Sequence, residues 1–328
     1  MNESPPPRES DLGRSPLRVV FMGTPALAAE ILKALAEASG DDFGVVGVVT
    51  RADRGKGRGL KLEASEVGAL AARLGLPTLK PEKIRTREFY QRVVEMRPDV
   101  LAVAAYGRIL PASILEIPRR LALNVHASLL PKFRGASPVE GAILSGDPTS
   151  GVTIMRVVEQ MDAGPILLQR DLAVDPAETQ ATLKEKLAVL GAAALIEVLG
   201  RLRFADLPET PQDESRATYT TVVRKEDAVI DWRSDAVQIE RMTRAYDPWP
   251  VARTKLAGDD LMLFRAHAVE SASAAATPST IVSIFPAPTV QCGRGLLELI
   301  EVQAAGRKRV RAADFIRGRR IEVGTRLG

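Results

Sequence analysis

The alternation of apolar runs and helical patterns constrains the fold of this chain more than any other sequence feature. Short, near-continuous apolar runs recur through the first 200 residues, at 17–22, 44–49, 100–104, 121–125 and 152–158. Such runs are typical of strands that are covered on both faces, as in a parallel sheet. Segments with helical periodicity lie between them. The alternation therefore predicts a doubly wound α/β domain.

The predicted helices begin at recognisable start signals. Thr24 is an expected N-cap, because Pro25 then takes the first helical position. Ser137 and Glu140 form a capping box that opens a short helix with Pro138 in its first turn. The two remaining predicted helices begin after Thr86 and Thr179.

The pattern changes after residue 203. Residues 204–221 are polar and Pro-rich, which predicts a linker. From residue 222 onward, short β-rich runs at 251–256, 261–269, 280–285 and 295–302 are separated by turns. Closely spaced short strands predict a small barrel or sandwich. Trp232 and Trp249 are expected in the core of this second domain.

Residue counts limit the chemistry that is open to the chain. A single cysteine, Cys292, excludes an intramolecular disulfide framework and a cysteine-cluster metal site. Imidazole chemistry has to use His126 or His267, the two histidines of the chain. No apolar run approaches the length of about 18 residues needed to span a membrane. Residues 1–15 are polar and Pro-rich, which predicts a disordered extension rather than a signal peptide and favours a cytoplasmic location.

Basic residues are concentrated in two segments. The formal net charge is +4, yet residues 301–328 carry +5 and residues 51–61 carry +4, which leaves −5 for the rest of the chain. Two basic segments on an acidic body indicate a polyanionic partner. A solvated, arginine-rich surface explains the same charges without any partner.

Two side chains suited to acyl transfer lie at the end of the predicted strand 121–125. Asn124 and His126 are two residues apart, so an extended backbone presents both on the same side. Ligands bind at the carboxyl ends of strands in open α/β sheets. Asp162 follows a later strand in a Gly/Pro turn. The amide can donate to an oxyanion, the imidazole can exchange protons, and the carboxylate can orient the imidazole. A structural histidine and an ordinary turn aspartate remain the alternative.

Other familiar motifs are incomplete. Ser128 lies close to His126 but lacks the G-x-S-x-G elbow, which argues against a serine hydrolase. Gly23-Thr24-Pro25 does not match G-x-G-x-x-G, and Pro25 removes a donor that a dinucleotide phosphate would use. Residues 54–59 lack the Gly-Lys-Ser/Thr end of a Walker motif.

Several segments carry a family resemblance. Asn124 to Pro131, with Arg134-Gly135 and Asp162, resembles the signature of folate-dependent formyltransferases. Further segments are similar to the methionyl-tRNA formyltransferase family: 21–25 to its opening motif, 54–61 to its flexible loop, and 231–232 with 245–250 to its C-terminal domain. The likeness runs from about Leu17 over nearly the whole chain. Leu60, Phe133 and Glu140 depart from the residues that are commonest in the family.

The resemblance implies a donor, an acceptor and a set of site residues. The donor would be 10-formyltetrahydrofolate, and the acceptor the α-amino group of methionine on initiator tRNA, for translation initiation. Asn124 and His126 are expected to stabilise the oxyanion, and Asp162 to orient His126, which assists proton transfer to the leaving folate nitrogen. The expected folate-binding residues are Ser128, Leu129, Leu130, Pro131, Tyr106 and Gly107. No metal is expected.

The resemblance also implies how the chain is divided. A Rossmann-like, doubly wound formyltransferase domain is expected at 16–203, and an OB-like β-barrel domain that binds tRNA at 222–328. Residues 301–328 are expected to contact the tRNA backbone with less specificity than the 51–61 segment. The residues expected to meet the tRNA acceptor arm are Arg54, Lys56, Gly57, Arg58 and Lys61, with Arg58 as the discriminating arginine. A monomer is expected.

Two other functions remain open at this point. A formyltransferase for an amino sugar or another small amine would share the Asn124, His126 and Asp162 constellation. It would not need two basic segments. A non-catalytic RNA-binding module would explain the basic segments, but it would not need an intact constellation.

Overall fold

The computed structural model describes residues 15–56, 61–270 and 276–328. The chain forms two compact units, which are described separately. The first comprises residues up to 136, 149–173 and 184–220, and the second comprises 137–148, 174–183 and 221–328. Within the described residues, no helix is long and apolar enough to cross a membrane.

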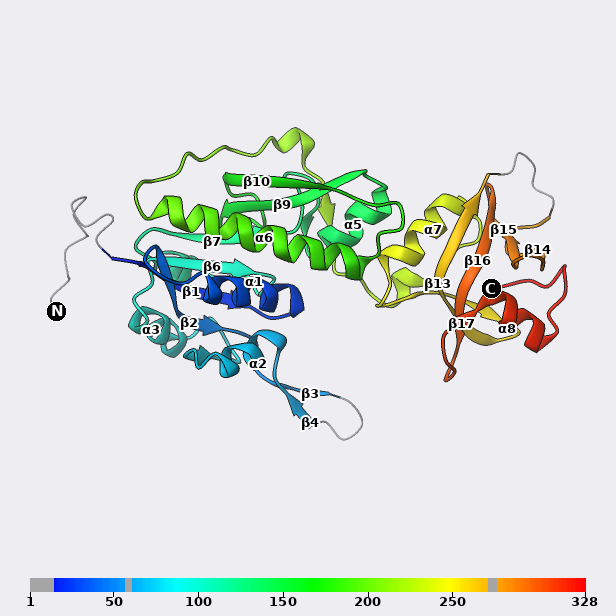
Figure 1. The fold of residues 1–328 in the computed structure, drawn as a ribbon, viewed down its shortest axis with the longest axis horizontal. Helices are drawn as coiled ribbons and strands as arrows, with labels where there is room; N and C mark the ends of the chain where they lie inside the picture. Colours follow the sequence, from blue (N-terminus) through cyan, green and yellow to red (C-terminus); the bar gives the residue numbers. More distant parts are fainter. Residues whose placement is uncertain (1–14, 57–60, 271–275) are drawn as a thin grey trace. The chain divides into compact units, whose positions relative to one another are not determined.

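A seven-stranded sheet forms the centre of the first unit (Figure 1). Its strands are β1 (Leu17–Gly23), β2 (Phe43–Val49), β5 (Thr78–Leu79), β6 (Val100–Ala104), β7 (Leu121–His126), β9 (Thr149–Arg156) and β10 (Ile166–Ala173). The spatial order is β10-β9-β7-β6-β1-β2-β5. Strands β5, β2, β1, β6 and β7 are parallel, whereas β9 and β10 join at one edge in antiparallel orientation. The predicted α/β sheet is confirmed.

Helices cover both faces of this sheet. They are α1 (Ala26–Glu37), α2 (Glu66–Arg73), α3 (Arg87–Glu95), α4 (Ala112–Leu115) and α6 (Gln180–Leu202), whose first residues cluster with the second unit. Helices α1 and α6 lie on one face (Figure 1). On the other face, Val20 and Met22 of β1 cluster with Phe89 and Val93 of α3. The alternation of strands and helices thus buries each parallel strand on two sides.

The helix caps agree only partly with the predictions. Thr86 caps α3, because its hydroxyl oxygen accepts a hydrogen bond from Phe89 N at 3.2 Å. The prediction for Thr24 is wrong: Pro25 occupies the N-cap position of α1, and Thr24 Oγ1 donates to the Tyr106 carbonyl at 3.0 Å. Ser137 stands at the N-cap of α5 (Pro138–Ser145) without a side-chain capping bond, so the predicted capping box does not form. Both hydroxyl groups bond to residues that are distant in the sequence, since Ser137 Oγ accepts from Val223 N at 3.4 Å.

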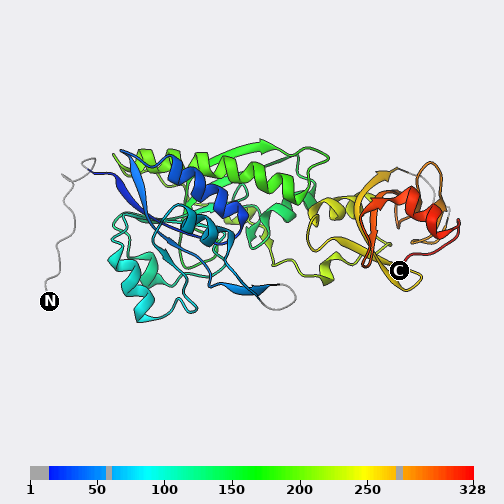
Figure 2. The ribbon, with the colours of Figure 1, turned by 60° about the horizontal axis from the view of Figure 1, so that its bottom comes forward.

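Two small pairs of strands complete the first unit. Strands β3 (Arg54–Lys56) and β4 (Lys61–Glu63) form an antiparallel ribbon that extends away from the sheet (Figures 1 and 2). Strands β8 (Arg134–Gly135) and β11 (Tyr219–Thr220) pair in parallel, and a 3₁₀ turn, η2 (Glu214–Arg216), precedes β11. The second pair draws residues from the predicted linker to the loop that follows β7.

The second unit contains a small β-barrel. Its helices are α5, α7 (Ala236–Ala245), α8 (Ala312–Arg319) and the 3₁₀ turn η3 (Glu226–Ala228). Its strands are β12 (Ala252–Leu256), β13 (Asp259–Val269), β14 (Ile281–Ser283), β15 (Thr289–Gln291), β16 (Leu296–Ala304) and β17 (Val310–Arg311). The order is β12-β13-β16-β15-β14, with β17 on β16. Bridges from Leu327 to Leu256 and from Arg326 to Thr280 join the two outer strands, which closes the barrel. The predicted barrel is confirmed.

The tryptophans of this unit differ in their surroundings. Trp232 is buried in the core, where its indole nitrogen donates to Thr254 Oγ1 at 3.0 Å. Cys292 is buried in the same core. Trp249 is 51% exposed, so its expected place in the core is wrong. It lies in a Pro-flanked turn between α7 and β12, where Pro248 is exposed and Pro250 is buried.

Candidate active site

Strand β7 presents Asn124 and His126 at its carboxyl end. This strand lies between β6, which is parallel to it, and β9, which is antiparallel. Asn124 is half-buried and His126 is 6% exposed, so both side chains lie beneath the surface at the sheet edge. The pleat places them on the same side of the strand, as the spacing predicts.

Asp162 reaches this edge from the loop between β9 and β10. Its Oδ2 lies 3.7 Å from His126 Nδ1 and accepts a hydrogen bond from Gly135 N at 2.8 Å. The 3.7 Å separation is too long for a direct hydrogen bond, but it is short enough for the carboxylate to stabilise a charged imidazole. The φ of Asp162 is +51°, a conformation that costs a residue with a side chain about 1–2 kcal/mol. The structure therefore brings the three predicted catalytic residues to one edge of the sheet.

A backbone carbonyl fixes the protonation of one His126 ring nitrogen. His126 Nε2 lies 3.0 Å from the Phe133 carbonyl oxygen. A carbonyl oxygen can only accept a hydrogen bond, so Nε2 carries a proton and donates it there. In the neutral ring, Nδ1 is then the basic nitrogen and faces Asp162. Phe133 has φ +60°, a strained conformation of the kind that clusters at functional sites.

The loop after β7 is held in place by buried polar groups. Ser128 is fully buried, and its hydroxyl donates to the Lys132 carbonyl at 2.6 Å. Thr153 Oγ1 donates to the Ser128 carbonyl and accepts from Leu130 N, and Gln169 Nε2 donates to the Leu130 carbonyl. The Ser128 hydroxyl is thus committed to the backbone, which agrees with the argument against a serine nucleophile. Neither Thr153 nor Gln169 carries a sequence motif that reveals its role.

The predicted folate-binding residues line this loop and its neighbour. Leu130 is buried, whereas Leu129 and Pro131 are half-exposed. Tyr106 is 2% exposed, and desolvation raises the pKa of its hydroxyl, whereas the nearby Arg108 and Arg51 charges lower it. A ligand at this place would therefore meet the backbone near Tyr106 rather than its ring. The assignment of these residues to folate remains a prediction.

The predicted acceptor-arm segment coincides with the β3–β4 ribbon. Arg54 pairs with Glu63, and Lys56 with Lys61, in the register of this ribbon. Gly57 and Arg58, at the tip of the predicted segment, lie outside the described residues. Arg54, Lys56 and Lys61 lie on the two paired strands, which is compatible with the predicted role of the segment. That role remains a prediction.

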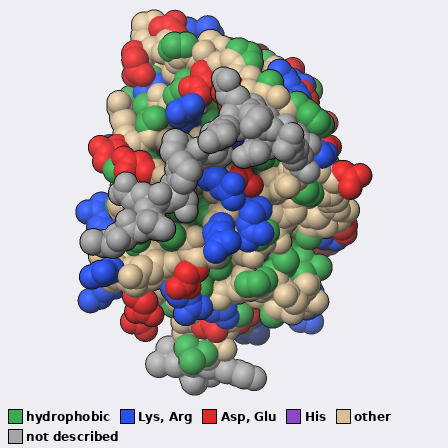
Figure 3. All heavy atoms as spheres, turned by 90° about the vertical axis from the view of Figure 1, so that its left-hand side faces the viewer, with side chains coloured by type: hydrophobic (Ala, Val, Ile, Leu, Met, Phe, Trp, Pro, Cys, Tyr) green, Lys and Arg blue, Asp and Glu red, His purple; other side chains and the backbone are tan. Residues whose placement is uncertain are grey.

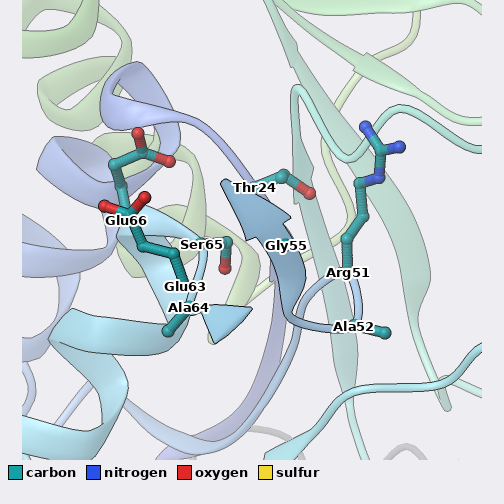
Figure 4. Close-up of a pocket in the computed structure, with 8 residues that line it drawn as sticks. All are labelled: Thr24, Arg51, Ala52, Gly55, Glu63, Ala64, Ser65 and Glu66. Atoms are coloured by element: carbon teal, nitrogen blue, oxygen red, sulfur yellow. The ribbon is translucent and has the colours of Figure 1, made fainter. Parts of the chain in front are cut away.

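A cavity of about 310 Å³ lies at the root of this ribbon (Figure 4). Thr24 follows β1 and Arg51 follows β2, so the cavity opens at the same edge of the sheet as His126. Strand spacing places it roughly 10–15 Å away, across β6. Figure 4 shows Glu63, Ser65 and Glu66 on one side and Arg51 on the other. The sequence did not indicate this cavity. Its lining residues are Thr24, Arg51, Ala52, Gly55, Glu63, Ala64, Ser65 and Glu66.

A further basic region lies near the opposite edge, where the parallel strands begin. Figure 3 shows Lys and Arg side chains gathered on the face that looks left in Figure 1. Arginines at this edge form ion pairs, Arg119 with Asp99 at 3.2 Å, Arg120 with Asp206 at 3.0 Å and Arg203 with Asp42 at 2.7 Å. We interpret the region as a surface ion-pair network. In the described part of the chain, no group of three metal-ligating side chains comes together.

Family models match both units. The formyl transferase model matches residues 17–199, and the model of the formyl transferase C-terminal domain matches residues 222–320. The methionyl-tRNA formyltransferase of Roseiflexus sp. is 45% identical over 95% of this chain and 96% of its own length. That of Thiobacillus denitrificans is 44% identical over 95% of this chain and 100% of its own.

A solved structure shows the same fold. The N-formyltransferase from Helicobacter canadensis, in complex with folinic acid and dTDP-3-aminofucose, aligns with a TM-score of 0.62 over 86% of this chain and 99% of its own. At 15% identity, this likeness shows the fold alone. The fold and the matched models define a folate-dependent formyltransferase. From the two curated relatives, the chain belongs to the methionyl-tRNA formyltransferase family.

Proposed function

We propose that this chain transfers a formyl group from 10-formyltetrahydrofolate to the α-amino group of methionyl initiator tRNA. Membership of the methionyl-tRNA formyltransferase family supports the reaction. The observation that carries the assignment of residues is the place of the His126 ring between the Phe133 carbonyl and the Asp162 carboxylate. Because Nε2 donates to the carbonyl, Nδ1 of the neutral ring carries no proton and can accept one.

The chemistry follows from this arrangement. The amine attacks the formyl carbon, and the carbonyl electrons move to oxygen to form a tetrahedral oxyanion. Asn124 donates to that oxyanion, and a preorganised donor of this kind is worth about 3–4 kcal/mol. His126 Nδ1 accepts the proton that the amine loses, and Asp162 stabilises the resulting imidazolium. Nδ1 then donates the proton to the folate nitrogen as the C–N bond breaks.

Two basic surfaces support tRNA as the acceptor substrate. The β3–β4 ribbon flanks residues 57–60 and stands at the same sheet edge as the cavity and His126. In this proposal, the ribbon meets the acceptor arm and Arg58 reads its end, because proteins read RNA sequence at unpaired ends. Lys308 and Arg311 of the barrel unit are exposed and meet phosphates. A cytoplasmic monomer remains the expected form.

Formation of formylmethionine tests the proposal. Purified protein, 10-formyltetrahydrofolate and charged initiator tRNA are expected to yield formylmethionyl-tRNA. His126→Ala is expected to lower kcat by roughly a hundredfold to ten-thousandfold, because a general acid–base group is removed. Affinity for tRNA is expected to change little.

His267→Ala is the matched control, because His267 is exposed on β13. It is expected to retain normal turnover. No product from the folded wild-type protein would refute the proposed reaction. Normal turnover by His126→Ala would refute the assignment of that residue.

A further inference from the structure

The segment 209–220, called here the anchoring segment, contacts the loop that follows β7, the strand that carries His126. Thr218 Oγ1 accepts from Phe133 N at 2.8 Å, and the Thr218 carbonyl accepts from Arg134 N at 2.8 Å. Strand β11 continues this pairing along β8. Gly135 permits the approach, because a Cβ there would lie 2.2 Å from the Thr220 carbonyl oxygen. The segment therefore fixes the position of the loop whose Phe133 carbonyl accepts a hydrogen bond from His126.

One side chain of the anchoring segment also binds the loop between β9 and β10, which carries Asp162. Gln212 Nε2 donates to the Asp162 carbonyl at 2.8 Å and to the Gly164 carbonyl at 2.7 Å. At the same time, Gln212 Oε1 accepts from Arg134 Nε at 3.0 Å and from Arg134 Nη2 at 2.8 Å. A single amide thus ties the Asp162 loop to the arginine that precedes Gly135.

Arg134, to which Gln212 is bound, is itself held in a fixed position. Its side chain is fully buried, and its guanidinium donates to both carboxylate oxygens of Glu214, at 2.7 and 2.9 Å. The hydrogen bond from Arg134 holds the pKa of Glu214 below its usual range. A bidentate pair of this kind fixes direction as well as distance. Gln212 is therefore bound to a group that cannot move easily.

We propose that Gln212 is a positioning residue of the active site, which holds Asp162 in its strained conformation opposite His126. A residue at φ +51° stays there only when its surroundings impose it. The two bonds from Gln212 fix the backbone at Asp162 and Gly164, and Gly135 N fixes the carboxylate. Loss of the Gln212 donors releases the backbone, so the carboxylate leaves its place beside Nδ1.

Three variants separate this role from a general stabilising role. Gln212→Glu keeps an acceptor for Arg134 but loses both donors to the Asp162 loop. Gln212→Met removes the donors and the acceptor at similar size. Ser215→Ala is the matched control, because it removes a hydrogen bond within the same segment, from Ser215 Oγ to Asp213 Oδ1 at 2.6 Å, and leaves the Gln212 donors and the Arg134–Glu214 ion pair intact. Ser215 is exposed.

Kinetics and histidine spectra report the outcome. Both Gln212 variants are expected to lower kcat by about tenfold to a hundredfold, as expected for a misplaced catalytic group, with KM values for tRNA and folate nearly unchanged. Ser215→Ala is expected to stay within about threefold of wild-type kcat, because the hydrogen bond it loses is exposed and does not involve Arg134, Gln212 or Asp162. If Gln212 had a merely structural role, its two variants would lower the melting temperature but would leave the kcat of the folded enzyme close to that of Ser215→Ala.

The ring nitrogens of His126 give a readout that needs no substrate. In ¹⁵N spectra, the Nδ1 signal is expected to shift in both Gln212 variants, whereas Nε2, which stays on Phe133, and His267 do not change. The inference rests on the proposed function. An inactive wild-type enzyme would refute only that function, because the Nδ1 signal would still report whether the Asp162 carboxylate lies beside His126. Wild-type kcat in Gln212→Glu, or an unchanged Nδ1 signal in both Gln212 variants, would overturn the inference.

Discussion

The role of His126 depends on which ring nitrogen is free to exchange a proton. The Phe133 carbonyl occupies Nε2, so proton transfer is assigned to Nδ1, the nitrogen that faces Asp162. The two contacts come from different loops. One is made by a backbone carbonyl, that of Phe133, and the other by the Asp162 carboxylate, which accepts a hydrogen bond from the backbone at Gly135 N. The identity of residue 133 therefore matters less than its conformation. This is compatible with the departure of Phe133 from the residue expected by family resemblance.

The buried thiol of Cys292 gives a prediction about pH at the same scale. Desolvation is the main cause that raises the pKa of Cys292 to about 12, from 9.0. The folded state therefore keeps the proton at pH values where the unfolded state loses it. This stabilisation is complete below pH 9.0 and is lost as the pH rises toward about 12.

Urea unfolding of wild type and Cys292→Ala measures this effect. The difference between their free energies of unfolding is expected to be constant below pH 9.0 and to shrink between 9.0 and about 12. The comparison with Cys292→Ala removes the contributions of lysines and tyrosines that titrate in the same range. A difference that stays constant over the whole range would show that the thiol titrates alike in both states.

At the scale of elements, the β3–β4 ribbon is expected to contribute to tRNA recognition but little to the stability of the fold. Its two strands pair with each other and lie outside the seven-stranded sheet. Substitution of Arg58, between these strands in the sequence, is therefore expected to leave the melting temperature unchanged. Arg58→Leu is expected to lower kcat/KM for initiator tRNA at least about tenfold, since loss of a specific polar contact costs about 1–3 kcal/mol. Equal use of initiator tRNA by the variant would exclude this segment as the reader.

The long elements of the fold could be predicted because burial dictates their residues. Each apolar run in residues 17–125 became a strand of the parallel sheet, with ends displaced by one residue at most. Two-residue strands such as β8 and β11 could not be predicted, since nothing local favours them. Their pairing depends on Arg134 and Thr218, which are 84 residues apart in sequence.

The candidate site was predictable to a similar degree. Asn124 and His126 share one strand, so their common side follows from the pleat. Asp162 was a candidate from its Gly/Pro turn after a later strand, but its distance from His126 could not be predicted, because the two residues lie on different strands and loops. Gln212 was not found, since a glutamine in a polar, Pro-rich segment carries the same signal as a solvent-exposed linker. Thr24 was misassigned as a cap because a tertiary acceptor, the Tyr106 carbonyl, competes for its hydroxyl.

For the whole molecule, the charge distribution makes association with tRNA dependent on salt. The net charge of +4 conceals two basic segments on an acidic body. Some basic side chains in residues 301–328 already form ion pairs within the protein, which makes them less available to bind tRNA phosphates. Arg317 lies 2.8 Å from Asp314, whereas Lys308 is exposed and, among the described residues, has no acidic side chain within ion-pair distance. An unpaired cation is the better phosphate ligand, because binding does not require an existing pair to break.

Lys308→Ala and Arg317→Ala form a matched test of this distinction. Each removes one positive charge from the barrel unit, and neither residue is part of its core. Lys308→Ala is expected to reduce the slope of log affinity against log salt by about 0.7–0.9, the value for one phosphate contact. Arg317→Ala is expected to change this slope less. Turnover at saturating tRNA is expected to stay normal in both, because the barrel contributes no reacting group. Equal slopes for the two variants would show that net charge, and not the pairing of individual side chains, governs how the barrel meets tRNA.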